Sequence, residues 1–390
     1  MIKGIFLHDL PVYKDKNGIY CSTTMTDDLF SRYLHVVDEL YVATRVYKID
    51  KTYEEAHQEK ITLANVKFIE FPNMNTVKGL FTVIPGIKKY LMKAMKNMDL
   101  IFIRGGTLAR IGANIALKLQ KPYLIEVGGF AWEASWNHSF KGKLIAPYYE
   151  LSLRKYVKKA DFAIYVTEKT LQKRYPTNGI STYASNVILT DIDYTALENR
   201  IEKIKNKKNK KIIIGTTGGI NNKAKGQHFV FEVMKNLENK YDITYELVGG
   251  GDNSFLLQQA KKFGQENNIT FKGELDHQEV LKWLDSIDIY IQPSMQEGLP
   301  RSVIEAMSRA CPVIGSNSGG TPELLEEENV FERGNIQSLQ SAFENIINSD
   351  WNKYAKRNFH KAEEYELSIL NSRREKIYEQ YRHFVIGGKN

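Results

Sequence analysis

Short apolar runs alternate with helix-like intervals along most of this chain, and they do so in two separate series. Seven runs form the first series, at residues 2–7, 40–46, 66–71, 100–103, 123–127, 162–166 and 182–187. Five runs form the second, at residues 212–215, 243–248, 269–271, 287–292 and 312–315. Strands that alternate with helices build parallel sheets covered by helices. The pattern therefore predicts an α/β protein with two Rossmann-like domains.

A polar, lysine-rich stretch separates the two series. Residues 198–211 show no regular apolar spacing after Ile204, which predicts a connector between domains. At 390 residues the chain also exceeds what one hydrophobic core usually supports. We expect an N-terminal domain at residues 1–195, a C-terminal domain at 196–365 and a last helix at 366–390.

Composition excludes several classes of protein. Hydrophobic residues make up 42% of the chain, a globular value, yet no apolar run has the roughly 20 residues that span a bilayer. The N-terminus has no signal-peptide pattern, so we expect a cytoplasmic protein. The two cysteines, Cys21 and Cys311, are too few for a disulfide framework or a zinc cluster.

Positive charge gathers in the first half of the chain. Residues 1–190 hold 27 Lys and Arg against 17 Asp and Glu, although the whole chain has a net charge of only +8. Basic helical segments at 84–98 and 141–159 could rest on an anionic bilayer, at about 1 kcal/mol per cation, or simply face the core with a solvated side. We expect peripheral association with the inner face of the cell membrane. We expect no nucleic acid partner, because nucleic-acid-binding motifs and aromatic platforms are missing from the sequence.

The segment at residues 289–325, IYIQPSMQEGLPRSVIEAMSRACPVIGSNSGGTPELL, predicts a ligand site. An apolar strand leads into a loop with Glu297, Gly298 and Leu299, and Pro300 suits the first position of a helix that carries Glu305. The free N–H groups of such a helix start favour an anion by about 0.3 to 2 kcal/mol. Alternatively, Glu305 could form a helix ion pair, since Arg301 and Arg309 lie four residues away on either side.

Glycine-rich turns follow three other strands of the second series. IIIGTTGGINNKAKG, at residues 212–226, contains Gly218, Gly219, Lys223 and Lys225 before a helix. Gly249 and Gly250 follow the next strand, and Gly273 follows the one after. Glycine permits a phosphate to approach the backbone, although such pairs also mark ordinary turns. Because ligands bind at the carboxyl ends of parallel strands, we expect these loops and Glu297 to share one ligand.

Glu297 and Glu305 are separated by seven residues, and with EGLP and the later GG and PE pairs they resemble the E-x7-E motif of retaining glycosyltransferases of family 4. The resemblance covers most of the C-terminal half. It implies the GT-B fold, in which two Rossmann-like domains face each other across a cleft and the last helix crosses back to the N-terminal domain. It also implies a nucleoside-diphosphate sugar as donor, possibly UDP-linked.

The same resemblance assigns roles to single residues. Glu305 would hold the ribose hydroxyls, and Glu297 with the amides of Gly298 and Leu299 would hold the transferred sugar and the diphosphate. Lys225 would bind the diphosphate. Many family members carry an arginine where this chain has Gly219, so Lys223 or Arg301 would have to supply a second positive charge. Resemblance to bacterial capsule and exopolysaccharide enzymes favours a saccharide or lipid-linked saccharide as acceptor.

Retention of configuration without a placed nucleophile implies that the protein supplies mainly electrostatic stabilisation, with the leaving phosphate taking the acceptor proton. We expect no metal and no cofactor. The D-x-D sequence at residues 191–193 is the kind of pattern that could hold a metal, but its position favours a turn or a helix cap.

The acceptor side gives weaker signals. The stretch GGFAWEASWNHS follows a strand, and within it Glu133 or His138 could act as general base. Many family members place a histidine directly after this strand, where this chain has Gly128 and Gly129. Residues 104–106, which follow another strand, could meet an acceptor phosphate or only make a turn.

Two other functions stay open. A sugar-nucleotide 2-epimerase uses the same two-domain plan but would group carboxylates and histidine around the sugar. A non-catalytic GT-B partner protein would retain the fold and lose diphosphate-binding positions, for which Gly219 is the one hint.

Overall fold

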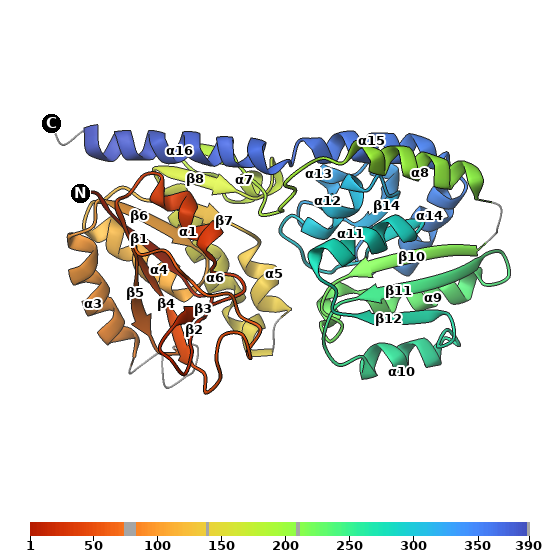
Figure 1. Ribbon diagram of the computed structural model, residues 1–390, viewed down its shortest axis with the longest axis horizontal. Helices are drawn as coiled ribbons and strands as arrows, with labels where there is room; N and C mark the ends of the chain where they lie inside the picture. The colour runs from red at the N-terminus through yellow and green to blue at the C-terminus, as the bar shows by residue number, and fades with distance from the viewer. Residues whose placement is uncertain (74–82, 138–139, 208–210, 388–390) are drawn as a thin grey trace.

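The computed structural model describes residues 1–73, 83–137, 140–207 and 211–387, and these form two α/β halves side by side (Figure 1). The described strands of the N-terminal half form one sheet in the order β3-β2-β4-β1-β6-β7-β8-β9, with β5 also paired to β4. Only β2 and β3 pair in antiparallel fashion within it. The strands are β1 (Lys3–His8), β2 (Val12–Lys14), β3 (Tyr20–Cys21), β4 (Glu39–Lys48), β5 (Val66–Phe71), β6 (Leu100–Arg104), β7 (Leu124–Val127), β8 (Phe162–Tyr165) and β9 (Ile180–Tyr183).

Helices cover this first sheet, since each parallel connection needs a crossover. They are α1 (Asp27–Leu34), α3 (Ile84–Lys96), α4 (Gly106–Lys118), α5 (Ala131–Trp136), α6 (Phe140–Lys158) and α7 (Thr170–Arg174). Helix α3 buries Ile84, Ile87, Leu91 and Met95 and leaves its lysines exposed, so its apolar stripe faces the core.

The second sheet is entirely parallel, in the order β12-β11-β10-β13-β14-β15. Its strands are β10 (Lys211–Thr217), β11 (Asp242–Val248), β12 (Ile269–Gly273), β13 (Ile289–Gln292), β14 (Val313–Ser316) and β15 (Val330–Phe331). Its helical elements are η1 (Lys223–Lys225), α9 (Gln227–Leu237), α10 (Ser254–Lys262), α11 (His277–Ser286), α12 (Arg301–Ser308), α13 (Thr321–Leu324), η2 (Glu327–Asn329) and α14 (Ile336–Ile347).

The central strands of both sheets lie in hydrophobic cores. Ile5, Phe6 and Leu7 of β1 are fully buried, as are Ile289 and Ile291 of β13. Strands with both faces covered read as continuous apolar runs, which is why their positions could be predicted. The two Rossmann-like halves confirm the predicted fold class.

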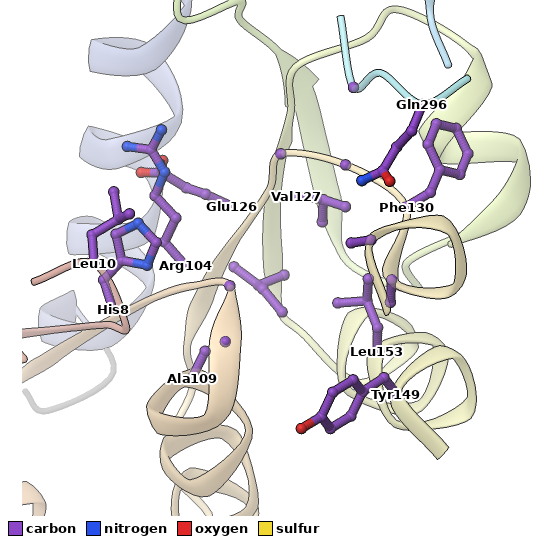
Figure 2. Close-up of a pocket in the computed structure, with 18 of the residues that line it drawn as sticks. His8, Leu10, Arg104, Ala109, Glu126, Val127, Phe130, Tyr149, Leu153 and Gln296 are labelled. Atoms are coloured by element: carbon purple, nitrogen blue, oxygen red, sulfur yellow. The ribbon is translucent and has the colours of Figure 1, made fainter. Parts of the chain in front are cut away.

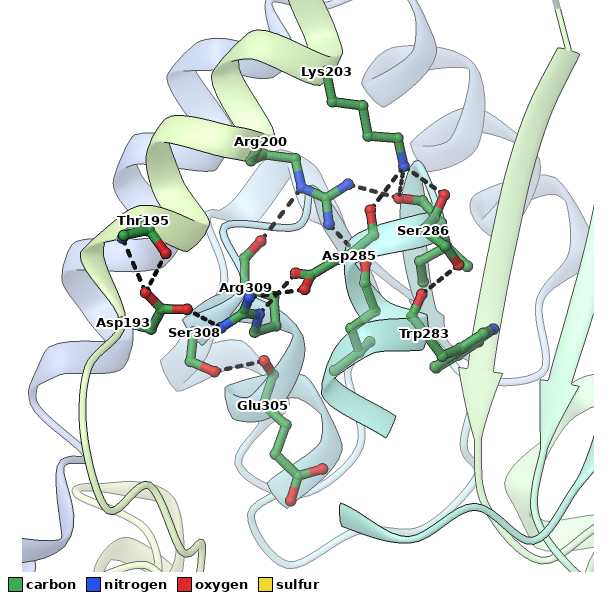
Figure 3. A network of polar contacts seen from close by, with 12 residues as sticks. Asp193, Thr195, Arg200, Lys203, Trp283, Asp285, Ser286, Glu305, Ser308 and Arg309 are labelled. Atoms are coloured by element: carbon green, nitrogen blue, oxygen red, sulfur yellow. Dashed lines mark hydrogen bonds and ion pairs between the residues drawn. The ribbon is translucent and has the colours of Figure 1, made fainter. Parts of the chain in front are cut away.

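The predicted lysine connector is wrong in its first part, because α8 (Tyr194–Asn206) is a helix packed on the C-terminal half (Figure 3). Its buried contact residue is Arg200, which donates hydrogen bonds to the backbone carbonyl oxygens of Leu284 at 2.7 Å and Ile287 at 2.6 Å. These carbonyls lie at the C-terminus of α11, where a cation is favoured. A buried arginine breaks the apolar spacing, so the helix resembled a connector.

The chain returns to the N-terminal half at its end. Helix α15 (Trp351–Glu363) lies against the C-terminal half, whereas α16 (Leu367–Gly387) runs along the N-terminal half, as predicted (Figure 1). Tyr381 of α16 accepts a hydrogen bond from the Ile101 amide at 2.9 Å and donates one to the Pro122 carbonyl at 3.0 Å. The chain thus crosses between the halves twice, and the two crossings are joined by a hydrogen bond from the Leu367 amide to the Leu189 carbonyl at 2.8 Å.

Candidate active site

The loop after β10 places Lys225 at the edge of the second sheet. Gly226 has a φ of +71°, and a Cβ there would overlap the Pro293 carbonyl, so only glycine fits the junction between η1 and α9. The lysine stem then passes close to Gly218, where a Cβ would lie 3.3 Å from it. The turn thus places the Lys225 ammonium near the carboxyl ends of the strands.

The Lys225 ammonium meets the Glu297 carboxylate, from a loop 72 residues away in sequence, at 2.8 Å. The same Glu297 oxygen accepts a hydrogen bond from the Gln292 side chain, also at 2.8 Å. Two residues that sequence patterns predicted separately are therefore in direct contact, and each is largely buried.

Gln292 is a positioning residue that the sequence reasoning missed. Its amide oxygen accepts hydrogen bonds from Tyr290 at 2.8 Å and Ser302 at 3.1 Å, so its amide nitrogen must face Glu297. Burial raises the pKa of Tyr290 to about 12, which keeps the phenol a donor. The available signal was a glutamine ending an otherwise apolar strand.

The predicted glycine loops lie next to one another. The Gly218 amide donates to the Val248 carbonyl at 2.9 Å, and the Gly249 amide donates to Gly273 at 2.8 Å. A Cβ on Gly249, whose φ is +146°, would overlap the Gly218 carbonyl. Gly250 receives a hydrogen bond from Ile220 at 2.9 Å. The loops after β10, β11 and β12 thus form one continuous backbone edge.

Glu305 lies on α12, with its side chain directed away from Arg309 (Figure 3). Arg309 instead binds Asp285 at 2.7 Å and Asp193 at 2.9 Å, which removes one partner of the alternative ion pair. Burial raises the pKa of Glu305, and electrostatic interactions, chiefly with the guanidinium of Arg301, lower it by less. Glu305 is half-buried, and no described side chain donates a hydrogen bond to its carboxylate, so a ligand hydroxyl can satisfy it.

Other predicted donor residues are more dispersed. Leu299 is buried, and Pro300 precedes α12 as its N-cap rather than forming its first residue. Arg301 is exposed at the start of α12. The Lys223 ammonium lies 4.2 Å from the centre of the Phe255 ring, whereas that of Lys225 pairs with Glu297. A Cβ on Gly219 would make ordinary van der Waals contacts, at 3.7 Å, with the side chains of Asn221 and Asn222.

A cavity of about 720 Å³ lies between the halves, and both line it (Figure 2). From the C-terminal half come Lys225, Gln296, Glu297 and Gly298. At one rim the halves touch, because a Cβ on Gly298 would overlap the Gly128 carbonyl. A hydrogen bond from Asn137 to Gln296 at 3.0 Å also bridges them.

The opposite wall of the cavity presents His8, Arg104 and Glu126 from the ends of β1, β6 and β7 (Figure 2). Glu126 accepts hydrogen bonds from Tyr33 at 2.7 Å and from Tyr378 of α16 at 2.8 Å. Burial would raise the pKa of Glu126, but Arg104, at 3.7 Å, and these hydroxyls lower it overall.

Burial and, to a smaller extent, the charge of Arg104 lower the pKa of His8 from 6.5 to about 3. The imidazole is therefore neutral at physiological pH, and its Nδ1 is buried without a hydrogen-bond partner. Sequence reasoning missed His8, although it ends the first strand.

Residues 104–106 do line the cavity, but a carboxylate occupies the start of α4. Asp9 accepts hydrogen bonds from the amides of Thr107 and Leu108, the latter at 2.7 Å. An acceptor phosphate would meet this negative charge, so a turn with an Asp cap is the reading that the contacts favour.

Glu133 does not line the cavity. It lies on α5 and pairs with Arg174 at 3.3 Å. His138 lies outside the described residues. Asp193 caps α8 by accepting from the Thr195 amide at 3.1 Å, which confirms the capping role. Within the described ranges no group of three His, Cys, Asp or Glu could hold a metal ion, and the metal-free mechanism stays a prediction.

Glu323 forms hydrogen bonds that bridge the two halves. Its carboxylate, on α13, accepts hydrogen bonds from the amides of Glu168, at 2.7 Å, and Lys169, at 3.1 Å, and from Thr170. These donors lie at the start of α7 in the N-terminal half, where a negative charge is favoured.

Two Rossmann-like halves with a cavity between the carboxyl ends of their strands, and a helix that returns to the first half, define a GT-B protein. Residues 198–364 match the family of glycosyl transferases group 1. The chain is 31% identical to protein CapJ of Staphylococcus aureus over 392 residues, which covers 98% of this chain and 96% of CapJ. The chain belongs to the group 1 glycosyltransferases.

Two further similarities are informative. The amylovoran biosynthesis glycosyltransferase AmsK of Erwinia amylovora is 34% identical over 89 residues, or 21% of this chain and 22% of AmsK. The structure of Anabaena HepE in complex with UDP aligns with a TM-score of 0.64 at 16% identity, over 97% of this chain and 99% of HepE. This chain is therefore a glycosyltransferase of the capsule and polysaccharide type. No helix in the described part of the chain is both long and apolar enough to cross a membrane.

Proposed function

We propose that this glycosyltransferase moves a sugar from a nucleoside-diphosphate sugar, UDP-linked in the first instance, to a lipid-linked saccharide with retention of anomeric configuration. The observation that carries the proposal is the contact of Lys225 with Glu297 at 2.8 Å, at the edge of a cavity that both halves line. A cation, a carboxylate and the start of α12 converge there, as the binding of a sugar diphosphate requires.

The roles follow from the contacts. Lys225 would leave Glu297 to bind the diphosphate, and the α12 amides would share its charge. Glu297, held by Gln292, would then accept hydrogen bonds from the sugar. Glu305 would receive the ribose hydroxyls at its half-buried carboxylate. HepE, whose structure contains UDP, has the same fold, which makes UDP the first nucleotide to test.

Transfer would proceed on one face of the sugar. The bond from the anomeric carbon to the diphosphate oxygen breaks, and the acceptor oxygen bonds to that carbon from the same side. The acceptor proton passes to the leaving diphosphate, so no protein base and no metal is required. Positioning and charge stabilisation by Lys225 are the chief contributions of the protein.

The cavity wall formed by His8, Arg104 and Glu126 would receive the acceptor. It combines a neutral imidazole, a cation and a carboxylate with apolar neighbours such as Leu153 and Tyr156. Sugar rings carry hydroxyls at their edges and C–H groups on their faces, which such a mixed wall can match.

Donor choice is tested first by thermal shift of the full chain against UDP-, GDP- and ADP-glucose. Nucleotide release is then measured with a panel of octyl glycosides as acceptors, with and without EDTA, and proton NMR of the product reports the anomer. We expect stabilisation by one nucleotide class, release that depends on acceptor and survives EDTA, and a retained anomer. An inverted product, or loss of release with EDTA, would contradict the mechanism.

A further inference from the structure

Helix α6 presents apolar side chains on two opposite faces, whereas a surface helix of a globular domain normally has one. The inner face contributes to the cavity through Tyr149, Leu153 and Tyr156 (Figure 2). The outer face carries what we call the α6 apolar stripe, which consists of Phe140, Leu144, Tyr148 and Leu151. Spacings of four, four and three residues put these side chains in one row along the helix.

The stripe is open to solvent. Its side chains are exposed by 77%, 72%, 64% and 67% in sequence order. The described part of the chain has fourteen exposed large apolar side chains, and six of them lie on α5 and α6. These six are the four residues of the stripe together with Trp136 and Ile145. Isolated exposed apolar residues need no explanation, but a contiguous row of large ones marks a surface that is covered in use.

The charges around the stripe have one sign. Residues 140–159 contain six cations, all exposed: Lys141, Lys143, Arg154, Lys155, Lys158 and Lys159. The single acid of this segment, Glu150, is buried and neutralised by Arg154 and Arg174, each at 2.9 Å. An apolar row with a purely cationic border matches the boundary between acyl chains and anionic head groups.

We propose that the α6 apolar stripe docks on an anionic lipid surface, with its side chains at the acyl boundary and the lysines at the head groups. The benefit that docking would bring to the enzyme rests on the proposed function, in which the acceptor is linked to a lipid. Because the inner face of the same helix lines the cavity, docking would hold the acceptor side of the cavity at the surface where a lipid-linked saccharide is anchored.

Two other surfaces fit less well. A symmetric pair of copies joined through this stripe would place one cationic border against another, which is repulsive. Helix α3, also lysine-rich, buries its apolar stripe and exposes a single large apolar side chain, Tyr90, among its lysines. The geometry therefore favours α6 over α3 as the contact.

The test is co-sedimentation of the full chain with vesicles of phosphatidylcholine alone, and with vesicles of equal parts phosphatidylcholine and phosphatidylglycerol. We expect binding to the mixed vesicles that weakens with salt. The double variant Leu144→Ser/Leu151→Ser should lower partitioning by at least about tenfold, since two large apolar side chains are lost. Tyr90→Ser, which removes a side chain 56% exposed on α3, is the matched control and should bind as the wild type does.

Two companion measurements make the outcomes distinct. Thermal shift with UDP-glucose should be unchanged in the double variant, which shows that it folds. If the wild type bound mixed vesicles but showed no thermal shift with any nucleotide sugar, the proposed function would be refuted and the docking proposal would still hold. Equal binding by the double variant, or a dimer in sedimentation velocity that the double variant abolishes, would overturn the docking proposal.

Discussion

Two regions of the cavity are built in different ways: the carboxyl edge of the second sheet, where we propose that the donor binds, and the wall of His8, Arg104 and Glu126, where we propose that the acceptor binds. We call them the donor edge and the acceptor wall. The donor edge is dense in local sequence signals, because Glu297, Gly298 and Glu305 lie within a few residues of one another. The acceptor wall takes one side chain from each of several strand ends, and Tyr378 from the last helix supports it. A site built from short segments that each carry several of its residues leaves motifs in the sequence, whereas one built from single residues brought together by topology does not.

The largest expected effect is on the donor edge. Lys225→Ala should lower turnover by about 100- to 1000-fold, the usual cost of losing one charge-stabilising donor in a transition state. Nucleotide release with a fixed acceptor measures it. Lys223→Ala is the matched control, because this neighbouring ammonium lies over Phe255 instead. Similar losses in both variants would show that general positive charge, and not the contact with Glu297, matters.

The next largest effect is expected at the contact between the two halves, where Gly298 lies against the Gly128 carbonyl. Gly298→Ala adds a Cβ that overlaps the Gly128 carbonyl, so the closed arrangement should be disfavoured by about 1 to 3 kcal/mol. We expect kcat/KM to fall accordingly. Gly128→Ala is the control, since a Cβ there meets nothing within 4 Å. If both variants kept full kcat/KM, the observed approach of the halves would not be the reactive one.

Glu323→Ala should act on closure without touching the cavity. It leaves the amides at the start of α7 without their carboxylate, at a cost of about 1 to 2 kcal/mol. A higher KM for the acceptor and faster proteolysis between the halves are the readouts. Glu328→Ala, which removes an exposed partner of Lys353 at 3.8 Å, should change neither. Unchanged KM in Glu323→Ala would count against its bridging role.

The smallest effect is a pH dependence from the acceptor wall. The folded pKa of His8 is about 3, below the ordinary 6.5, so the unfolded chain binds a proton in this window that the folded chain does not. The free energy of unfolding should therefore fall as pH drops below about 6.5, by roughly 1 to 2 kcal/mol at about pH 5.

Urea unfolding at several pH values measures this effect, and the free energy of unfolding should fall less steeply in His8→Gln. The lowered pKa of Glu126 acts only below its ordinary 4.5, and His228, whose pKa burial also lowers, contributes equally to both proteins. If the free energy of unfolding depended on pH in the same way in the wild type and in His8→Gln, the pH effect would not come from His8.

Local spacing predicted the two sheets and the loops at the carboxyl ends of the second series of strands, whereas the return of the last helix was implied by the resemblance to GT-B glycosyltransferases. Arg200 shows where this reasoning ends, since a buried arginine that caps α11 looks like part of a charged connector. His8 and Glu126 show a second limit, because only the order of the strands brings β1 and β7 to the same wall. The contact of Gly298 with Gly128 depends on how the halves sit, which no local spacing encodes.

The hydrogen bond between Leu367 and Leu189 has a mechanical consequence. Because the two crossings are joined to each other, we expect any relative motion of the halves to be a hinge about this line rather than a free rotation. Such a motion would open the cavity on the side away from the crossings.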